Sequence, residues 1–296
     1  MRVEPTAVGV EGAPAAALGL RTVVAAYSVE SYAVPRPRGL LGDENLRRLA
    51  AQVKGLHSFR FSAAGSESTV FQRLAVELER RTGMAHEPET GERLLRFRRS
   101  ADPGAGGWEV LARLTPRPLS ARAWRVRDVP GALNATIAAA MIRLAAPRPG
   151  ERYLNLMCGS GTLLAEAPPG LGPVGLDSSR EALAAARANT DAALVLGDVR
   201  QAPFKAGAFD VLVADLPYGE RSGSHATNDR LYREFLAAAD RLASQKARLA
   251  VISHDIRRFE AALEDAGAWH LELKLRVFQK GYQPAIWLLK PGVRDN

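Results

Sequence analysis

Apolar residues in the second half of the chain form short runs that alternate with longer amphipathic segments. Each run has the length and composition of a buried strand, and the runs lie at residues 152–158, 173–177, 194–198, 209–215 and 247–253. Helical spacing of apolar residues fills the intervals, most clearly at 178–189, 228–243 and 257–267. Strands that alternate with helices in this way predict a parallel sheet covered by helices on both faces.

The ends of this pattern add three local predictions. Asn134 precedes an alanine-rich helical segment and has the side chain of an N-terminal cap. The spacing Ser178-x-x-Glu181 predicts a capping box at the start of a later helix. Near the carboxyl end, residues 269–290 form two strand-like runs around Gly281 with no helix between them. They predict an antiparallel hairpin that closes the sheet.

The amino-terminal part has a mixed pattern of helices and strands. Apolar positions with helical spacing run from Ser68 to Gly83, and a shorter helical segment begins at Asp43. Strand patterns surround these helices, at residues 21–34, 57–65, 93–99 and 108–114. We therefore predict a smaller α/β domain at 1–116, a basic linker at 117–133 and the domain with the parallel sheet at 134–296.

Positive charge is concentrated toward the amino terminus. The 296 residues carry a formal net charge of +8, and residues 1–130 hold 20 Lys+Arg against 14 Asp+Glu, a balance of +6. Nearly all of this excess is arginine. A basic module beside a nearly neutral one is typical of proteins that hold an anionic partner with one part and process it with the other. The alternative is a coding bias toward arginine on a solvated surface.

Cysteine usage and hydropathy exclude several protein classes. The chain has one cysteine, Cys158, so it has no internal disulfide framework and no pair of cysteines with metal-ligand spacing. No apolar run approaches the ~18 to 20 residues of a membrane span, and the amino terminus lacks the apolar centre of a signal peptide. We expect a cytoplasmic protein without a metal. The sequence leaves its oligomeric state open.

Glycines and acidic residues follow the predicted strands of the parallel sheet. In an open parallel sheet, ligands bind beyond the carboxyl ends of the strands. One glycine loop follows the first strand, and acids follow the second, third and fourth. The expected cofactor-binding residues are Asn155, Met157, Cys158, Gly159, Ser160, Gly161, Asp177, Ser178, Asp198, Val199 and Asp215.

The glycine loop narrows the choice of ligand. A dinucleotide fingerprint needs Gly or Ala where the chain has Leu164, and a phosphate-binding loop needs a Lys that is absent here. The loop therefore suits a ligand with a ribose and no pyrophosphate. Asp177 is positioned to accept hydrogen bonds from the ribose hydroxyls, and Asp198 from an adenine amine. The ligand that fits is S-adenosylmethionine.

Four segments resemble known protein families. "DLPYG", from Asp215, resembles the [Asp/Asn/Ser]-Pro-Pro-[Tyr/Phe] motif of amino-directed methyltransferases. "NATIAAAMIRLA" with "NLMCGSGTLLAEA", and "VGLDSSREALAAARAN", are similar to the THUMP-containing RNA methyltransferases that make N2-methylguanosine in tRNA. The resemblance runs from about Arg117 to the carboxyl end, and more loosely over 20–116. It implies a Rossmann-like class I methyltransferase sheet with a C-terminal antiparallel hairpin, preceded by a smaller α/β THUMP/ferredoxin-like domain.

The resemblance also assigns roles to individual residues. The lone pair of an exocyclic amine is delocalised into the base, so methyl transfer requires that it be localised and aimed. Asp215 would accept one amine hydrogen, and the Leu216 carbonyl, freed by Pro217, the other. Tyr218 would stack on the base. The family usually has Asp where this chain has Asn155, and Asn keeps a hydrogen bond to the methionine amine but loses the ion pair.

Cys158 lies in the glycine loop and not after the fourth or a later strand, so we expect a small buried residue and not the nucleophile of pyrimidine methylation. The expected activity is methylation of a guanosine N2 in tRNA. Three alternatives remain open: amino-methylation of DNA, methylation of a protein glutamine, and an RNA-binding protein that has lost catalysis. The expected RNA contacts are Arg93, Arg96, Arg98, Arg99, Arg117, Arg122, Arg125 and Arg127.

Overall fold

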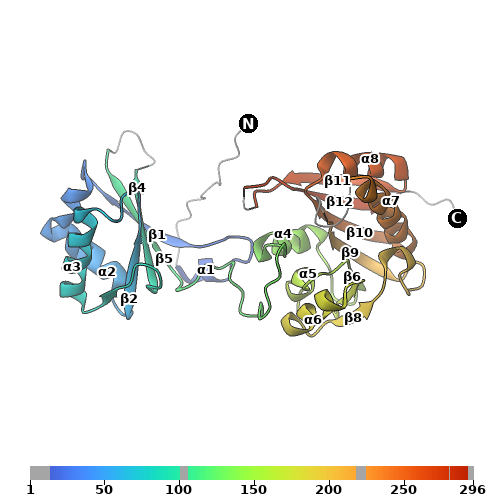
Figure 1. Cartoon of the computed structure of the whole chain (residues 1–296), viewed down its shortest axis with the longest axis horizontal. Helices are drawn as coiled ribbons and strands as arrows, with labels where there is room; N and C mark the ends of the chain where they lie inside the picture. The colour runs from blue at the N-terminus through green and yellow to red at the C-terminus, as the bar shows by residue number, and fades with distance from the viewer. Residues whose placement is uncertain (1–13, 101–105, 218–224, 280, 293–296) are drawn as a thin grey trace. The chain divides into compact units, whose positions relative to one another are not determined.

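The computed structural model describes residues 14–100, 106–217, 225–279 and 281–292 (Figure 1). The chain divides into two compact units, and the division falls between Ala121 and Arg122. It therefore lies inside the linker expected at 117–133, and the linker residues from Arg122 onward pack with the second unit.

The first unit is a five-stranded sheet with helices. Its helices are α1 (Pro14–Leu18), α2 (Asp43–Val53) and α3 (Thr69–Thr82), with the 3-10 helix η1 (Pro37–Leu41). Its strands are β1 (Tyr27–Tyr32), β2 (Ser58–Ser62), β3 (Ala85–His86), β4 (Arg93–Arg99) and β5 (Trp108–Arg113), in the order β1-β5-β4-β2-β3. Strand β4 pairs antiparallel with β5 and parallel with β2.

Helices α2 and α3 cover one face of this sheet, as Figure 1 shows. Leu49 of α2 and Phe71 of α3 are buried against Phe61 and Phe97 of the strands. The rings of Phe61 and Phe97 lie 5.2 Å apart at 86°, an edge-to-face arrangement that aromatic pairs favour. The helix expected to end at Gly83 does so, because this glycine adopts a left-handed conformation with φ of 72°.

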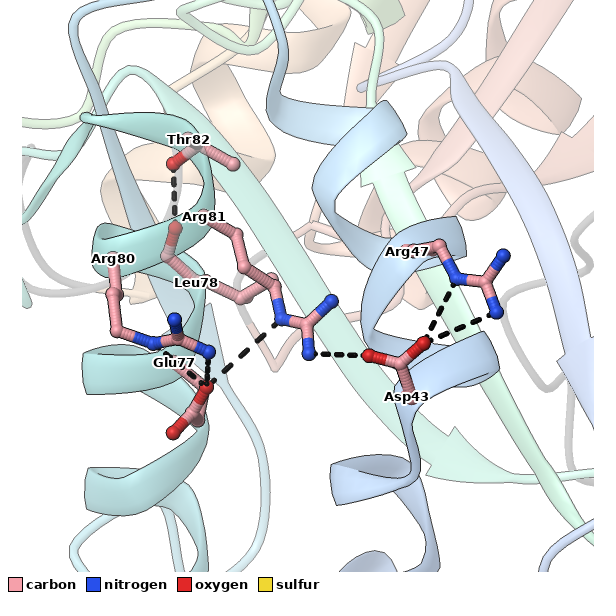
Figure 2. A network of polar contacts seen from close by, with 7 residues as sticks. All are labelled: Asp43, Arg47, Glu77, Leu78, Arg80, Arg81 and Thr82. Atoms are coloured by element: carbon pink, nitrogen blue, oxygen red, sulfur yellow. Dashed lines mark hydrogen bonds and ion pairs between the residues drawn. The ribbon is translucent and has the colours of Figure 1, made fainter.

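An ionic network joins the two helices at the surface (Figure 2). Arg81 of α3 lies 2.7 Å from the carboxylate of Asp43 on α2, and Arg47 lies 3.1 Å from the same carboxylate. The hydrogen bond from Arg81 is the main reason that the pKa of Asp43 is lowered. Because Asp43 is exposed, the network adds little stability.

The second unit contains a seven-stranded sheet. Its helices are α4 (Ala135–Ala145), α5 (Thr162–Ala165), α6 (Arg180–Asn189), α7 (His225–Leu242) and α8 (Ile256–Ala266), with the 3-10 helix η2 (Val199–Gln201). Its strands are β6 (Tyr153–Leu156), β7 (Val174–Asp177), β8 (Ala193–Leu196), β9 (Phe209–Asp215), β10 (Ala243–Ser253), β11 (Trp269–Arg276) and β12 (Ala285–Pro291). The order is β11-β12-β10-β9-β6-β7-β8.

Five neighbouring strands, β10, β9, β6, β7 and β8, are parallel. Strand β12 runs antiparallel to both β10 and β11, which confirms the hairpin expected at the carboxyl end. Apolar clusters cover both faces of the sheet: α7 and α8 pack Tyr232 and Phe259 against Trp287, and α4 packs Met141 against Tyr153. The predicted parallel sheet with helices on both faces is therefore confirmed (Figure 1).

The structure confirms one cap and corrects another. The Asn134 side chain accepts a hydrogen bond from the Thr136 amide at 2.9 Å and caps α4 as expected. Helix α6 is capped by Ser179, which accepts from the Ala182 amide, and not by Ser178. The reason is that Asp177 accepts a hydrogen bond from the Ser179 amide, which turns the chain and delays the helix by one residue.

Membrane spans and metal clusters are both missing from the part of the chain that the structure describes. Among these residues, no helix combines the length and the apolar composition that crossing a membrane requires. Within the same residues, no three His, Cys, Asp or Glu side chains come close enough together to hold a metal ion.

Candidate active site

The carboxyl ends of four adjacent strands bring the predicted polar residues to one edge of the second sheet. Asp215 ends β9, Asn155 lies in the next strand β6, Asp177 ends β7, and Asp198 follows β8. The four strands are parallel, so their carboxyl ends lie side by side.

The glycine loop between β6 and α5 has an unusual backbone. Met157, Gly159 and Gly161 all have positive φ, at 58°, 54° and 80°. A Cβ on Gly161 would meet the Cβ of Ala186 in α6 at 3.2 Å, whereas a Cβ on Gly159 would meet nothing within 4 Å. Gly161 therefore permits close packing against α6, and Gly159 leaves the backbone open to a ligand.

Asp177 joins this loop to the start of α6 through its two carboxylate oxygens. Its Oδ2 accepts a hydrogen bond from the Gly159 amide at 2.8 Å, and its Oδ1 accepts one from the Ser179 amide at 2.9 Å. A carboxylate oxygen can accept more than one hydrogen bond. Asp177 can therefore hold the loop and still accept from ribose hydroxyls, while Ser178 beside it is exposed.

Asn155 carries a buried polar atom with no partner. Its side chain is 1% exposed, and its Oδ1 accepts no hydrogen bond from the part of the chain that the structure describes. Burying an unpaired acceptor costs about 1 to 3 kcal/mol. An acceptor held in this way at the edge of the sheet fits a ligand with an amino group.

Asp198 has a partner that the sequence did not reveal. It caps η2 by accepting from the Arg200 amide at 2.9 Å, and the Arg200 Nε lies 2.9 Å from both of its oxygens. The hydrogen bond from the Arg200 side chain is the main cause of the lowered pKa of Asp198. If the half-exposed Asp198 carboxylate accepts a hydrogen bond from an adenine amine, the same oxygens must also bind Arg200. The neighbouring Val199 is buried.

Cys158 is a buried thiol, as expected. Its side chain is 6% exposed, and burial is the main factor that raises its pKa to about 12. A thiol with this pKa stays protonated near neutral pH and is a poor nucleophile. The structure thus gives Cys158 a packing role in the loop.

The segment that precedes α4 is fastened to the loop region by a buried carboxylate. Glu166, which follows α5, has a fully buried side chain and accepts hydrogen bonds from the Arg122 Nε at 2.8 Å and the Trp124 indole at 3.0 Å. Arg125 donates to the Leu133 carbonyl at 2.8 Å. Arg122 and Arg125, two of the arginines expected to contact RNA, therefore bind groups within the protein.

Asn189 continues the same attachment. Its Oδ1 accepts from the amides of Val126 and Arg127 at 2.9 and 2.8 Å, and its Nδ2 donates to the carbonyls of Arg127 and Ser160. One buried side chain thereby joins the linker segment to the glycine loop. No pattern in the sequence signals this contact, because Asn189 has the features of an ordinary helix-end residue.

Asp215 ends β9, the central strand of the seven-stranded sheet. Burial raises the pKa of its carboxyl group to about 7. The next residue, Leu216, is 1% exposed and donates its amide hydrogen to the Ile252 carbonyl at 2.9 Å, which extends the pairing of β9 with β10. Tyr218, expected to stack on the base, lies outside the described residues.

A buried tyrosine anchors the segment after Asp215. The Tyr232 hydroxyl donates to the Pro217 carbonyl at 2.8 Å and lies 3.3 Å from the Ser253 Oγ, which accepts from the Asp255 amide at 3.1 Å. Each group in this chain of hydrogen bonds has a partner. Tyr232 is therefore a positioning residue that holds Pro217 against α7 and β10.

Replacing Tyr232 by Phe is expected to lower kcat about tenfold, because the Pro217 carbonyl loses its donor and the segment loses its alignment. The cofactor Kd should not change. The matched control is Tyr32→Phe, which removes another buried tyrosine hydroxyl in the first unit. Steady-state kinetics and a thermal melt of both variants check this. Equal kcat values in the two variants would show that Tyr232 does not position the segment at Pro217.

The arginines expected to contact RNA differ in their surroundings. Arg93 donates to the Arg113 carbonyl and is half-buried, and Arg98 pairs with Glu109 at 2.7 Å. The guanidinium of Arg99 lies 5.4 Å from the Trp108 ring. The exposed members without a side-chain partner among the described residues are Arg96, Arg117 and Arg127. Their contact with RNA remains a prediction.

Comparison with known proteins assigns the second unit. The family described as "RMKL-like, methyltransferase domain" matches residues 122–169 and 170–284, beginning where the second unit begins. The chain belongs to this family. Its relatives include the tRNA (guanine(6)-N2)-methyltransferase of Thermus thermophilus, with 31% identity over 86% of this chain and 78% of the relative.

Two further comparisons extend this family assignment. The tRNA (guanine(6)-N2)-methyltransferase of Archaeoglobus fulgidus is 32% identical over 49% of this chain, and the chain spans 45% of the length of that relative. The crystal structure of TrmN from Thermus thermophilus superposes with a TM-score of 0.73 at 25% identity, covering 96% of this chain and 88% of TrmN. The class I methyltransferase fold predicted from the sequence is confirmed.

Proposed function

We propose that this family member transfers a methyl group from S-adenosylmethionine to the exocyclic N2 of a guanosine in tRNA. The observation that carries the proposal is Asp215, a partly buried carboxylate with a raised pKa that ends the central strand β9 next to the residues suited to hold the cofactor. The names of the relatives support guanosine 6 as the position.

The residues on β6, β7 and β8 fit the cofactor. The unpartnered Asn155 Oδ1 suits the methionine amino group, the open side of Gly159 suits close approach of the ligand to the backbone, and Asp177 suits the ribose. When bound there, S-adenosylmethionine supplies an electrophilic methyl group on a sulfonium. The Rossmann-like site needs to supply only orientation and the removal of a proton.

Asp215 performs the proton chemistry in this proposal. In its ionised form it accepts a hydrogen bond from one amine hydrogen of the guanine, which localises the nitrogen lone pair. The same carboxylate then takes the proton that the amine must lose. A pKa of about 7 suits a group that alternates between these forms near neutral pH.

The first unit is proposed to dock the tRNA. Its compact α/β sheet is compatible with the THUMP/ferredoxin-like domain that the sequence resemblance implies, with domain limits near 1–116. The exposed Arg96 of β4 and Arg117 after β5 would contact phosphates and make binding fall steeply with salt. We propose that the enzyme acts in the cytoplasm.

The test is transfer of labelled methyl from S-adenosylmethionine, offered separately to unmodified tRNA, DNA and protein. The proposal predicts label in tRNA alone. Label in DNA would favour the alternative of an adenine or cytosine amino-methyltransferase, and label in protein would favour a glutamine-directed enzyme. No transfer, together with no cofactor binding by calorimetry, would favour an RNA-binding protein without catalysis.

Replacing Asn155 by Asp is expected to tighten S-adenosylmethionine binding about tenfold, because the buried acceptor gains an ion pair with the methionine ammonium. Without cofactor, the new buried charge lacks a partner, so the variant should melt at a lower temperature than the wild type. Calorimetric titration and paired melts with and without cofactor measure both effects. Unchanged affinity would show that Asn155 does not face the amine.

A further inference from the structure

A cavity of about 630 Å³ opens beside the catalytic strand, on the flank away from the cofactor residues. Its walls come from α7, from the end of β10, from the first turns of α8 and from the end of β11. The charged groups that line it are Asp229, Arg233, Asp255, Arg257, Arg258 and Arg276. Four arginines against two aspartates make its lining basic.

The strand register ties this cavity to Asp215. Ile252 of β10 pairs with Asp215 of β9. The next residue, Ser253, pairs with Ala285 of β12, which pairs with Arg276 of β11. Three strand spacings therefore separate Asp215 from Arg276, roughly 14 Å along the edge of the sheet. A base turned out of its stack and a phosphate of the neighbouring nucleotide can span this distance.

Two of the four arginines are already neutralised. The guanidinium of Arg258 contacts Asp229 at 3.2 Å and Asp255 at 2.8 Å, and Arg233 contacts Asp265 at 2.8 Å. Arg257 and Arg276 are exposed and have no carboxylate partner among the residues that the structure describes. They are the two charges in the described lining of the cavity that are available to an anion.

An exposed aromatic ring stands at the rim. The ring of Tyr282 meets the ring of His254, which lines the cavity, at 5.6 Å and 77°, and Tyr282 is 62% exposed. Phe278 on the same hairpin is 56% exposed. Exposed rings beside unpaired arginines are typical of surfaces that bind single-stranded nucleic acid, where bases stack and phosphates meet cations.

We propose that this cavity binds a backbone phosphate of the nucleotide next to the target guanosine, through Arg257 and Arg276. The inference rests on the proposed function, because Asp215 must act on a base of the same strand. The sulfonium and ammonium groups of S-adenosylmethionine outweigh its single carboxylate, so the cofactor has a net positive charge and a basic cavity does not suit it. A phosphate is anionic, and its oxygens can accept two parallel hydrogen bonds from one arginine guanidinium.

The test is the double variant Arg257→Ala/Arg276→Ala in the full chain, with Lys246→Ala as control. Lys246 is an exposed cation in the amino-terminal half of β10, away from the cavity. The double variant should raise the KM and Kd for tRNA about tenfold with kcat within twofold. It should also lower the slope of log Kd against log salt by about 1, the loss of one phosphate contact. Lys246→Ala should match the wild type.

The outcomes separate the two proposals. If the wild type transfers no methyl to tRNA, the proposed function fails and this inference fails with it. If the wild type methylates tRNA but the double variant keeps the wild-type Kd and salt slope, the phosphate site alone is overturned. Cofactor affinity and the melting temperature of the double variant should equal those of the wild type, which separates a lost contact from a lost fold.

Discussion

Replacing Asp215 by Asn is expected to lower kcat about a thousandfold, since the amide can neither take the amine proton nor localise the lone pair as a carboxylate does. The affinity for S-adenosylmethionine should stay within about twofold, because the other cofactor residues lie on β6, β7 and β8. Single-turnover transfer to tRNA measures the first quantity, and calorimetric titration measures the second.

The matched control lies at the opposite end of the same strand. Asp210 of β9 forms an ion pair with Arg152 at 2.9 Å, so Asp210→Asn removes a carboxylate from β9 without touching the site. Its kcat should equal that of the wild type. A wild-type rate in Asp215→Asn would contradict the role of Asp215, and an equal loss in both variants would point to a general disturbance of β9.

The raised pKa of Asp215 predicts how the kcat and the stability of the wild type depend on pH, and how Asp215→Asn should differ. Wild-type kcat should rise with pH through about 7, because only the ionised carboxyl can take the amine proton. Stability should run the opposite way: a carboxyl whose folded pKa exceeds its unfolded value stabilises the fold at low pH, and this contribution is lost as pH rises through about 7. Asp215→Asn should therefore lack this loss and melt above the wild type at pH 8.

The largest effect on stability is expected at Glu166. Replacing it by Ala leaves the Arg122 guanidinium and the Trp124 indole buried without their acceptor. Removing one partner of a buried ion pair costs about 3 to 5 kcal/mol. The melting temperature of the second unit should fall by about 10 °C. Differential scanning calorimetry of the full chain measures the change.

The control for Glu166 uses an exposed ion pair in the same segment. Asp128 contacts Arg125 at 3.1 Å, but its side chain is 79% exposed, so Asp128→Ala should change the melting temperature by no more than a degree or so. A drop at Glu166 no larger than that at Asp128 would show that the buried carboxylate does not fasten the linker segment.

The sequence predicted the parallel sheet well because the physics of its strands is local. Continuous apolar runs such as 209–215 and 247–253 can be buried on both faces only inside a covered sheet. The acids at their ends were found because ligands bind beyond the carboxyl ends of the strands in an open parallel sheet. Asp177 and Asp215 thus followed from one pattern.

The contacts that join distant segments were not predictable in the same way. Tyr232 has the spacing of one more apolar position on the buried face of α7, and only the fold brings its hydroxyl to the Pro217 carbonyl. Arg200 is two residues from Asp198, but nothing in the sequence says which conformation pairs them. The cap at Ser179 in place of Ser178 was not predictable either, because the spacing Ser178-x-x-Glu181 favours Ser178 and only the fold shows that Asp177 binds the Ser179 amide.

The arginines show most clearly which contacts the sequence could not predict. Arg122 and Arg125 have the same sequence features as Arg127, a basic residue in a proline-containing linker. The structure turns the first two toward Glu166, Leu133 and the loop region, and leaves the third exposed. A count of positive charge cannot separate these cases, because a guanidinium serves a buried carboxylate as well as a phosphate.

The most direct test of methylation at a guanosine N2 in tRNA is to digest tRNA methylated by the wild type and identify the labelled nucleoside. We expect N2-methylguanosine. We also expect that a transcript with inosine at position 6, which lacks the 2-amino group, takes up no label. Label in another nucleoside, or undiminished methylation of the inosine transcript, would contradict the proposed activity.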